Sequence, residues 1–287
     1  MRFLVVALFS LVTAQLQAAD NPYADVEVKV VPLTDSISML MGAGGHIGVS
    51  YGPDGMLMID DQFEPLAGKI KEALKTIGPE VPTFLLNTHY HGDHTGGNVA
   101  FGDDSIIMAH QNVRIRLVDG DKDGKLPKSA LPVITYTHQA SLHFNGEEIV
   151  LLHTPSSHTD GDTVVHFSDS NVIHMGDIFF KDLFPYVDIG AGGTVDGLIG
   201  SIEAILEIVE DDTKIIPGHG DGPANKADLI RYLTMLKSTS ATVKHWIAEG
   251  KSEQEILDTG LGSEWQSWSW NFISEERWIK TLYNSYR

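Results

Sequence analysis

The sequence contains no cysteine among its 287 residues. Disulfides, thiolate metal ligands, cysteine nucleophiles and lipid attachment through cysteine are therefore excluded. Any metal site has to be built from nitrogen and oxygen donors, which means from histidine and carboxylate side chains. The chain has 13 histidines, so donors of this kind are plentiful.

Positive charge is also scarce. The chain has 20 lysines and arginines against 39 acidic residues, which gives a formal net charge of -19 at pH 7. A surface with this average repels the phosphate backbone, so we expect no nucleic acid among the partners. Most of the excess acidic residues are expected to be solvated surface charges.

Long apolar runs are absent after the first residues. Residues 3–14 form the longest one, behind the positive charge of Arg2 and ahead of a pair of alanines, which is the layout of a secretory signal peptide. About 12 residues are too few to span a bilayer, which takes roughly 20. We expect a signal peptide over residues 1–19, one mature domain over residues 20–287, and a periplasmic or secreted protein with no membrane contact after cleavage.

The remaining sequence alternates between strand and helix patterns. Short β-type runs over residues 26–60 predict an antiparallel meander with a hairpin at residues 52–55, and apolar residues at helical spacing predict a helix over residues 63–78. The later predicted elements are strands at residues 147–153, 163–167, 171–174 and 214–220 and helices at residues 195–210 and 226–249. Two halves of strands followed by helices predict an α/β fold of two facing sheets with outer helices.

The stretch NTHYHGDHTGGN, residues 87–98, concentrates possible metal ligands at the end of a predicted buried strand. His89 and His91 lie two apart on extended chain, so their side chains point to the same side. Asp93 and His94 follow where the chain turns toward a helix. These four residues are predicted to lie within a few ångströms of one another.

Three more candidate ligands follow later strands. They are His158 in HTPSSHTDGD, Asp177 in HMGDIFF and His219 in IPGHG. Layered α/β folds collect ligands at the carboxyl ends of their strands, so we expect all seven side chains at one place.

Seven such donors suit two zinc-like ions that share a hydroxide, roughly 3.5 to 4 Å apart. Asp177 would bridge the two ions. The first ion would be bound by His89, His91 and His158, and the second by Asp93, His94 and His219.

This pattern resembles the metallo-β-lactamase superfamily. Its signature H-x-H-x-D-H is present at residues 89–94 as HYHGDH. The family's later motifs follow in the same order, at His158, at Gly176-Asp177 and at Pro217-Gly218-His219. The resemblance covers about residues 26–250. It implies an αββα sandwich of two facing mixed β-sheets with outer helices, and a site for up to two metal ions.

Two departures from the family's pattern concern the substrate. The β-lactamase subclasses with a cysteine at the second metal would carry it at Asp177, whereas an aspartate there is what glyoxalase II, lactonase and related hydrolases use as a bridge. Those β-lactamases also hold the drug's carboxylate with a lysine, and Lys181 is the nearest counterpart, one place late. No asparagine in residues 188–197 matches the one that polarises the lactam carbonyl.

We therefore expect an exported hydrolase with two Zn2+ ions that acts on a lactam, lactone or thioester. The shared hydroxide would attack the carbonyl, with Asp93 orienting it and accepting its proton. Lys181 would bind a substrate carboxylate. Iron and manganese suit the same donors. The expected partner is a small-molecule substrate, and no pattern indicates an oligomeric state.

Three alternatives stay open at this point. Two metals serve phosphodiester hydrolysis equally well, although no basic cluster lies near the motifs. Some members of the superfamily are mononuclear iron dioxygenases that act on persulfides and use fewer ligands. A periplasmic protein that binds metal without turnover is the third.

Several other features have local interpretations. The glycine-rich residues 42–46 form either a flap over the site or a tight hairpin, and residues 119–132 form an irregular loop at its rim. DGDKDG at residues 119–124 lacks the glutamate that ends a calcium loop. The tryptophans after residue 252 are predicted to belong to the core. Six histidines are predicted to be structural: His110, His138, His143, His153, His166 and His174.

Overall fold

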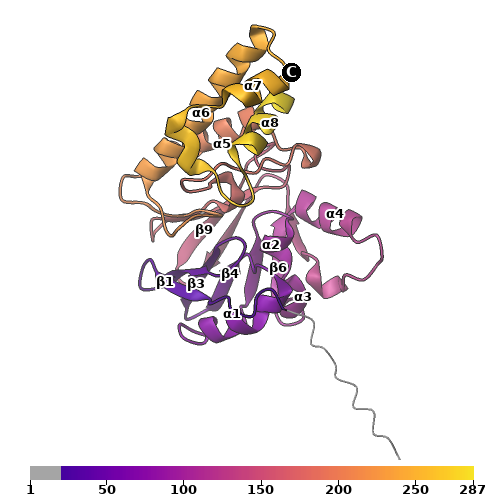
Figure 1. Cartoon of the computed structure of the whole chain (residues 1–287). Helices are drawn as coiled ribbons and strands as arrows, with labels where there is room; N and C mark the ends of the chain where they lie inside the picture. Colours follow the sequence, from indigo (N-terminus) through magenta and orange to yellow (C-terminus); the bar gives the residue numbers. More distant parts are fainter. Residues whose placement is uncertain (1–20) are drawn as a thin grey trace, which may run out of the picture.

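Two β-sheets lie face to face in the computed structural model, which describes residues 21–287 (Figure 1). The first sheet has seven strands that follow one another in chain order. They are β1 (Lys29–Pro32), β2 (Ile37–Met41), β3 (Ile47–Gly52), β4 (Gly55–Ile59), β5 (Phe84–Asn87), β6 (Ile106–His110) and β7 (Ile134–Tyr136). Strands β1 to β4 pair antiparallel and β4 to β7 pair parallel, which confirms the predicted meander. The predicted signal peptide, residues 1–19, lies outside the described residues.

The second sheet has five strands in the order β12, β11, β10, β9, β8. They are β8 (Gln139–Phe144), β9 (Glu147–His153), β10 (Thr163–Phe167), β11 (Val172–His174) and β12 (Lys214–Ile216). Only β11 and β12 pair parallel, so this sheet is also mixed. Met39 and Leu86 of the first sheet share one buried cluster with Leu151 and Val165 of the second. Burial of this apolar surface holds the two sheets together.

Helices cover the outer faces of both sheets (Figure 1). The α-helices are α1 (Ala67–Leu74), α2 (Gly92–Thr95), α3 (Asn98–Phe101), α4 (Gln111–Gly120), α5 (Val195–Leu206), α6 (Lys226–Ala248), α7 (Glu253–Thr259) and α8 (Glu275–Tyr286). Short 3-10 helices are η1 (Glu64–Leu66), η2 (Lys128–Ala130), η3 (Gly176–Ile178), η4 (Ile189–Ala191) and η5 (Ser263–Trp268). Ile70 of α1 packs on the first sheet, and Ile202 of α5 and Leu236 of α6 pack on the second. The predicted αββα sandwich is confirmed. Within residues 21–287, no helix has the length and apolarity needed to cross a membrane.

The sequence patterns do not predict β6, β7, β8 or α4. Strand β7 has three residues, two of them exposed, and α4 buries only Val113. Strands β7 and β8 and helix α4 are short or half-exposed, so they carry little of the hydrophobic periodicity on which prediction from sequence depends. This reason does not apply to β6, which has four buried residues out of five. The predicted helix over residues 63–78 is η1 followed by α1, which ends at Leu74.

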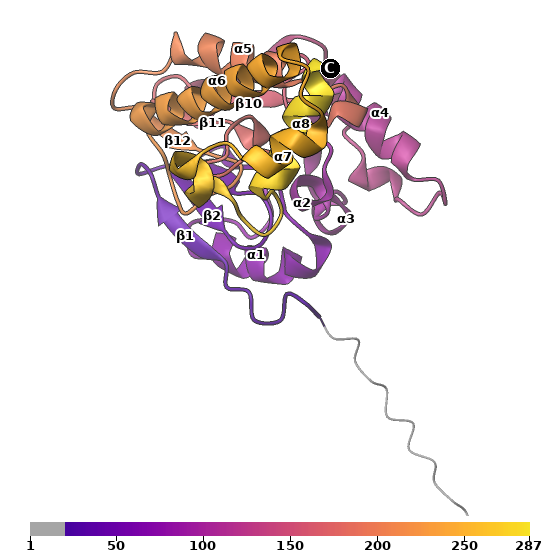
Figure 2. The same cartoon turned by 45° about the horizontal axis from the view of Figure 1, so that its top comes forward.

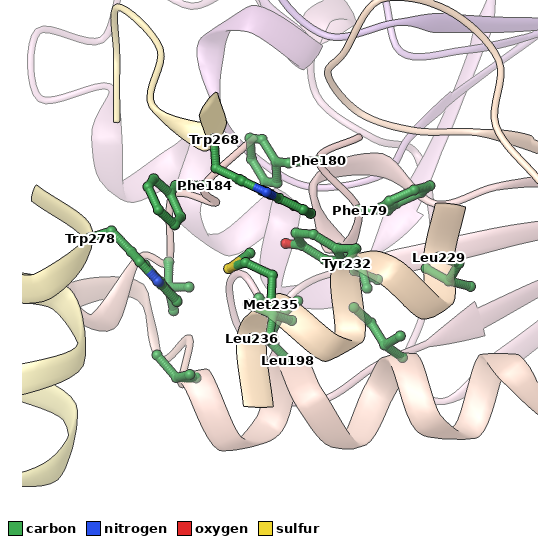
Figure 3. Packing of buried hydrophobic residues seen from close by; sticks show 14 of the residues in the cluster. Phe179, Phe180, Phe184, Leu198, Leu229, Tyr232, Met235, Leu236, Trp268 and Trp278 are labelled. Carbon is green, nitrogen blue, oxygen red and sulfur yellow. The ribbon is translucent and has the colours of Figure 1, made fainter. Parts of the chain in front are cut away.

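The chain after α6 folds back over the second sheet, where α8 packs on α6 and α7 packs on α8 (Figure 2). Figure 3 shows Trp268 and Trp278 beside Phe184 and Tyr232 in the buried cluster there. Trp278 is fully buried, and its Nε1 donates to Thr239 Oγ1 at 3.1 Å. The predicted core positions of these two tryptophans are confirmed, and they anchor the tail to the sandwich.

Candidate metal centre

Four of the predicted ligands follow strand β5 directly. The strand ends at Asn87, and His89 lies on the stretch after it. His91 has extended backbone and is the residue that precedes α2, while Asp93 and His94 lie within that helix. The change from extended chain to helix brings four side chains from six consecutive positions to one place.

The other three predicted ligands come from the second sheet. His158 lies in the loop between β9 and β10, Asp177 lies in η3 shortly after β11, and His219 follows β12. A β-bridge between Phe180 and His219 joins the last two segments. The strand ends of both sheets therefore deliver all seven side chains to one edge of the sandwich.

The first group consists of His89, His91 and His158 together with Asp177. His91 Nδ1 lies 3.0 Å from His89 Nε2 and 2.9 Å from His158 Nε2. Asp177 Oδ2 lies 3.8 Å from His89 Nε2 and 3.6 Å from His158 Nε2. Four donor atoms thus converge on one point.

The second group consists of Asp93, His94 and His219. Asp93 Oδ2 lies 3.3 Å from His219 Nε2 and 3.7 Å from His94 Nε2. The other oxygen of Asp177, Oδ1, lies 3.1 Å from His94 Nε2 and 3.3 Å from His219 Nε2. Each oxygen of Asp177 therefore faces a different group, which is the arrangement of a bridging carboxylate.

The donor set fits metal ions. His94 Nε2 and Asp177 Oδ1 are buried and lie 3.1 Å apart, and neither makes a hydrogen bond of good geometry among residues 21–287. Buried polar atoms without a partner are rare because each one costs about 1 to 3 kcal/mol. These two atoms belong to a set of donors made only of imidazoles and carboxylates. Zinc, iron and manganese all bind such nitrogen and oxygen ligands.

The two groups differ in the protons that they carry. Burial lowers the pKa of His89 well below its usual value and that of His158 to about 4, so both are neutral at pH 7. Burial also acts on His94 and His219, but the Asp177 carboxylate and its neighbours outweigh it. They raise the pKa of His94 well above 6.5 and that of His219 to about 9.

Two further carboxylates hold the ligands in place. Asp60 Oδ2 lies 2.7 Å from His94 Nδ1, and the same carboxylate accepts from the amide and the hydroxyl of Thr88. Asp188 Oδ2 lies 2.9 Å from His91 Nε2 and accepts from Tyr90 OH at 2.6 Å. Such partners fix the ring orientation of ligating histidines.

Prediction from the sequence missed both carboxylates. Asp60 follows β4, so the strand-end rule that selects the seven ligands would also select Asp60. Asp188 lies in the segment searched only for an asparagine, and no motif marks it.

Residues 42–46 form the turn of the hairpin between β2 and β3, and this turn packs on the metal ligands. The amide of Gly45 donates to the carbonyl of Asp93 at 3.1 Å. A Cβ at Gly45 would overlap the His94 ring, and Gly44 has φ 93, where a side chain is strained. Glycine is required here for close approach.

A cavity of about 550 Å³ opens over the two groups. It is lined by Gly44, Phe63, Tyr90, His91, Asp93, Asp177, Phe180, Tyr186, Asp188, His219, Trp270 and Phe272. Trp270 is partly buried and packs against the core cluster, and it also lines the cavity, which the prediction of a core position did not include. The predicted rim loop, residues 119–132, contributes no lining residue.

Lys181 does not reach this cavity. Its Nζ lies 2.7 Å from Asp221 Oδ1 and donates to the carbonyl of Pro223 at 3.1 Å. The predicted contact between Lys181 and a substrate carboxylate therefore has no support in the observed geometry. The six histidines predicted to be structural lie outside both groups.

Replacing Asp188 with asparagine keeps the side-chain shape but removes the charge that orients His91. We expect the affinity of the first group for zinc to fall about 10- to 100-fold, which is typical for loss of a carboxylate partner. Competition with a chromophoric chelator measures this affinity. Asp182→Asn, which removes an exposed partner of Arg231, is the matched control. Equal affinities in Asp188→Asn and wild type would contradict the positioning role.

Zinc binding to the two groups should release different numbers of protons at pH 7. The first group has neutral His89 and His158, whereas His94 and His219 must lose about one to two protons between them before they bind metal. Because the pKa of His219 is about 9, this release should decrease as the pH rises from 7 through 9. Calorimetric zinc titrations in buffers of different ionisation enthalpy measure it. Equal release at both binding steps would argue against this charge distribution.

The chain is similar in sequence to hydroxyacylglutathione hydrolases. A hydroxyacylglutathione hydrolase of Synechococcus sp. (strain JA-2-3B'a(2-13)) is 24% identical over 210 residues, which cover 67% of this chain and 76% of the relative. Another, from Rhizobium meliloti (strain 1021), is 27% identical over 158 residues and covers 52% of each chain.

Solved structures show the same fold. The inverting sec-alkylsulfatase Pisa1 from Pseudomonas sp. superposes with a TM-score of 0.71 at 14% identity over 90% of this chain, which spans half of the sulfatase. DIM-1 metallo-beta-lactamase superposes with a TM-score of 0.62 at 17% identity, covering 75% of this chain and 99% of the other. Residues 52–219 match the model of the metallo-beta-lactamase superfamily. With this match over more than half of its length, and with this fold and ligand set, the chain belongs to the metallo-beta-lactamase superfamily.

Proposed function

We propose that this chain, a hydrolase of the metallo-beta-lactamase superfamily, uses two zinc ions to cleave a carbonyl compound such as an ester, thioester, lactone or lactam. One observation carries the proposal. Asp177 has one oxygen toward each ligand group, at 3.6 to 3.8 Å from the first and 3.1 to 3.3 Å from the second. Paired ions that share such a bridge are typical of hydrolytic sites.

The bound ions would supply charge that polarises a carbonyl oxygen and activates water at neutral pH. The protein's own contribution starts with Asp93, which lines the cavity beside His219. Burial alone would raise its pKa, but His94 and His219 keep the pKa of Asp93 below its usual value, so the carboxylate is ionised. Asp93 can therefore accept a hydrogen bond from the attacking water, orient it and take up its proton.

The names of the relatives and the residues that line the cavity both support an acyl substrate. The curated relatives are named as hydrolases of hydroxyacylglutathione, an acyl compound. The lining of the cavity contains no lysine or arginine that would bind the oxygens of a phosphodiester. The complete second group of ligands favours hydrolysis over a reaction that needs a single ion.

Removal of the metal should abolish hydrolysis of a chromogenic ester, thioester, lactone or lactam, and added zinc should restore it.

Asp93→Asn should lower kcat by about 100- to 10,000-fold, because it removes the group that orients and deprotonates water. Metal content is measured in parallel, since Asp93 also belongs to the second group. Asp103→Asn, at an exposed carboxylate, is the matched control.

Two results would contradict the proposal. The first is hydrolysis that persists in protein shown by elemental analysis to be free of metal. The second is turnover of a phosphodiester by the zinc-loaded protein at a rate above that of every carbonyl substrate.

A further inference from the structure

Six aromatic side chains line the cavity over the metal groups. They are Phe63, Tyr90, Phe180, Tyr186, Trp270 and Phe272. The last two come from the tail of the chain, beyond residues 52–219 that match the family model. Half of the lining is therefore aromatic, and part of it is contributed by a segment that the family model does not cover.

Four of these rings form a continuous wall from one metal group to the other. Phe180 stacks on the His219 ring with centroids 5.1 Å apart, and Trp270 lies 5.7 Å from His219. Phe272 lies 5.6 Å from Trp270. At this end the wall begins beside the second group.

The other end of the wall reaches the first group. Tyr186 lies 5.5 Å from Phe272 and 5.6 Å from His91. A substrate whose carbonyl lies between the two groups would therefore have its attached group against aromatic rings. Phe180, Trp270, Phe272 and Tyr186 are called the aromatic wall below.

The aromatic wall is held rigidly. Trp270 Nε1 donates to the carbonyl of Phe184 at 2.9 Å, and Phe184 is fixed in the buried cluster of Figure 3. The guanidinium of Arg277 lies 4.4 Å from the centre of the Phe272 ring and donates to the Phe272 carbonyl at 2.8 Å. Little conformational freedom remains to be lost when a ligand binds, which favours affinity.

The lining of the cavity contains carboxylates but no lysine or arginine, and the Arg277 guanidinium lies beside it, 5.5 Å from the Tyr186 ring and 4.4 Å from the Phe272 ring. The carboxylates of the lining are Asp93, Asp177 and Asp188. The exposed Arg277 forms no salt bridge among residues 21–287, whereas Arg116 is paired with a carboxylate. Arg116 makes two hydrogen bonds to Asp160 behind Tyr90, at 2.6 and 2.7 Å.

A carboxylate on the distal part of a substrate would meet aromatic faces or other carboxylates. Aromatic faces carry partial negative charge, and like charges in a cavity of low polarity repel. The mouth is apolar as well, since Phe272 is 48% exposed and Ile189, next to Asp188, is 45% exposed.

We propose that the substrate of this site is an uncharged ester, thioester or lactone with an aromatic or bulky apolar group, which the aromatic wall binds. This inference rests on the proposed hydrolase function. It makes Trp270 and Phe272 the residues that determine specificity, and it excludes substrates with a carboxylate distant from the scissile bond.

Binding is tested with butyranilide, an uncharged amide that resembles a phenyl ester. Its carbonyl is not strained, so binding can be measured without turnover. Calorimetry on the zinc-loaded protein and on the metal-free protein gives its affinity without reference to turnover. Trp270→Ala should weaken binding about tenfold through loss of ring contacts. Trp265→Ala, at another half-buried tail tryptophan outside the cavity, is the matched control and should bind as wild type does.

Turnover is tested with two esters of similar size, 4-nitrophenyl hexanoate and the mono-4-nitrophenyl ester of adipic acid, which differ by one distal carboxylate that is too far from the ester to attack it. The uncharged ester should have at least about a tenfold higher kcat/KM, because the lining of the cavity contains three carboxylates and no lysine or arginine. Phe272→Ala, at a half-exposed position that should tolerate truncation, and Trp270→Ala should both reduce this preference. Trp270→Phe, which keeps a ring, should retain most of it.

The outcomes separate this inference from the hydrolase proposal. Equal turnover of both esters, or butyranilide affinity unchanged by Trp270→Ala, would overturn the inference and leave the hydrolase proposal standing. If neither ester nor any other carbonyl compound is cleaved, the hydrolase proposal fails, whereas binding of butyranilide that depends on Trp270 still supports the aromatic site.

Discussion

The carboxylate of Asp177 is the group on which the whole site depends. It is buried, and its two oxygens lie beside histidines of both ligand groups. A buried ionised carboxylate needs hydrogen bonds or positive charge close by, because its desolvation costs several kcal/mol. Protonated His94 and His219 can supply that charge, and metal ions would replace their protons.

This arrangement constrains the backbone around it. A Cβ at Gly218 would overlap Asp177 Oδ1, and one at Gly45 would overlap the His94 ring. Glycines thus allow the hairpin turn of the first sheet and the strand end of the second to approach the same ligands. Outside this rigid centre, the tail anchored by Trp278 carries Trp270 across the opening. The cluster of metal ligands suits hydrolysis in general. The tail, through Trp270, would determine which substrates bind beside it.

The predictable and unpredictable parts of the molecule differ in physical terms. The sandwich and the clustering of the seven candidate ligands could be predicted because each candidate follows an apolar strand that is easy to recognise. Asp60 obeys the same rule but has no motif. Asp188 and Trp270 carry no local signal, since only the folded tail and loops bring them to the cavity. The role predicted for Lys181 rested on spacing alone, and spacing does not reveal that Asp221 binds its ammonium. Strand β7 and helix α4 were missed because they bury too little to leave a pattern.

A crystal structure of the zinc-loaded protein, with data collected at the zinc absorption edge, tests the bridging role of Asp177 most directly. Two anomalous peaks are expected roughly 3.5 to 4 Å apart. One should lie beside Asp177 Oδ2 within the first group, and the other beside Asp177 Oδ1 within the second. A single peak, or a pair of which only one contacts Asp177, would contradict the account.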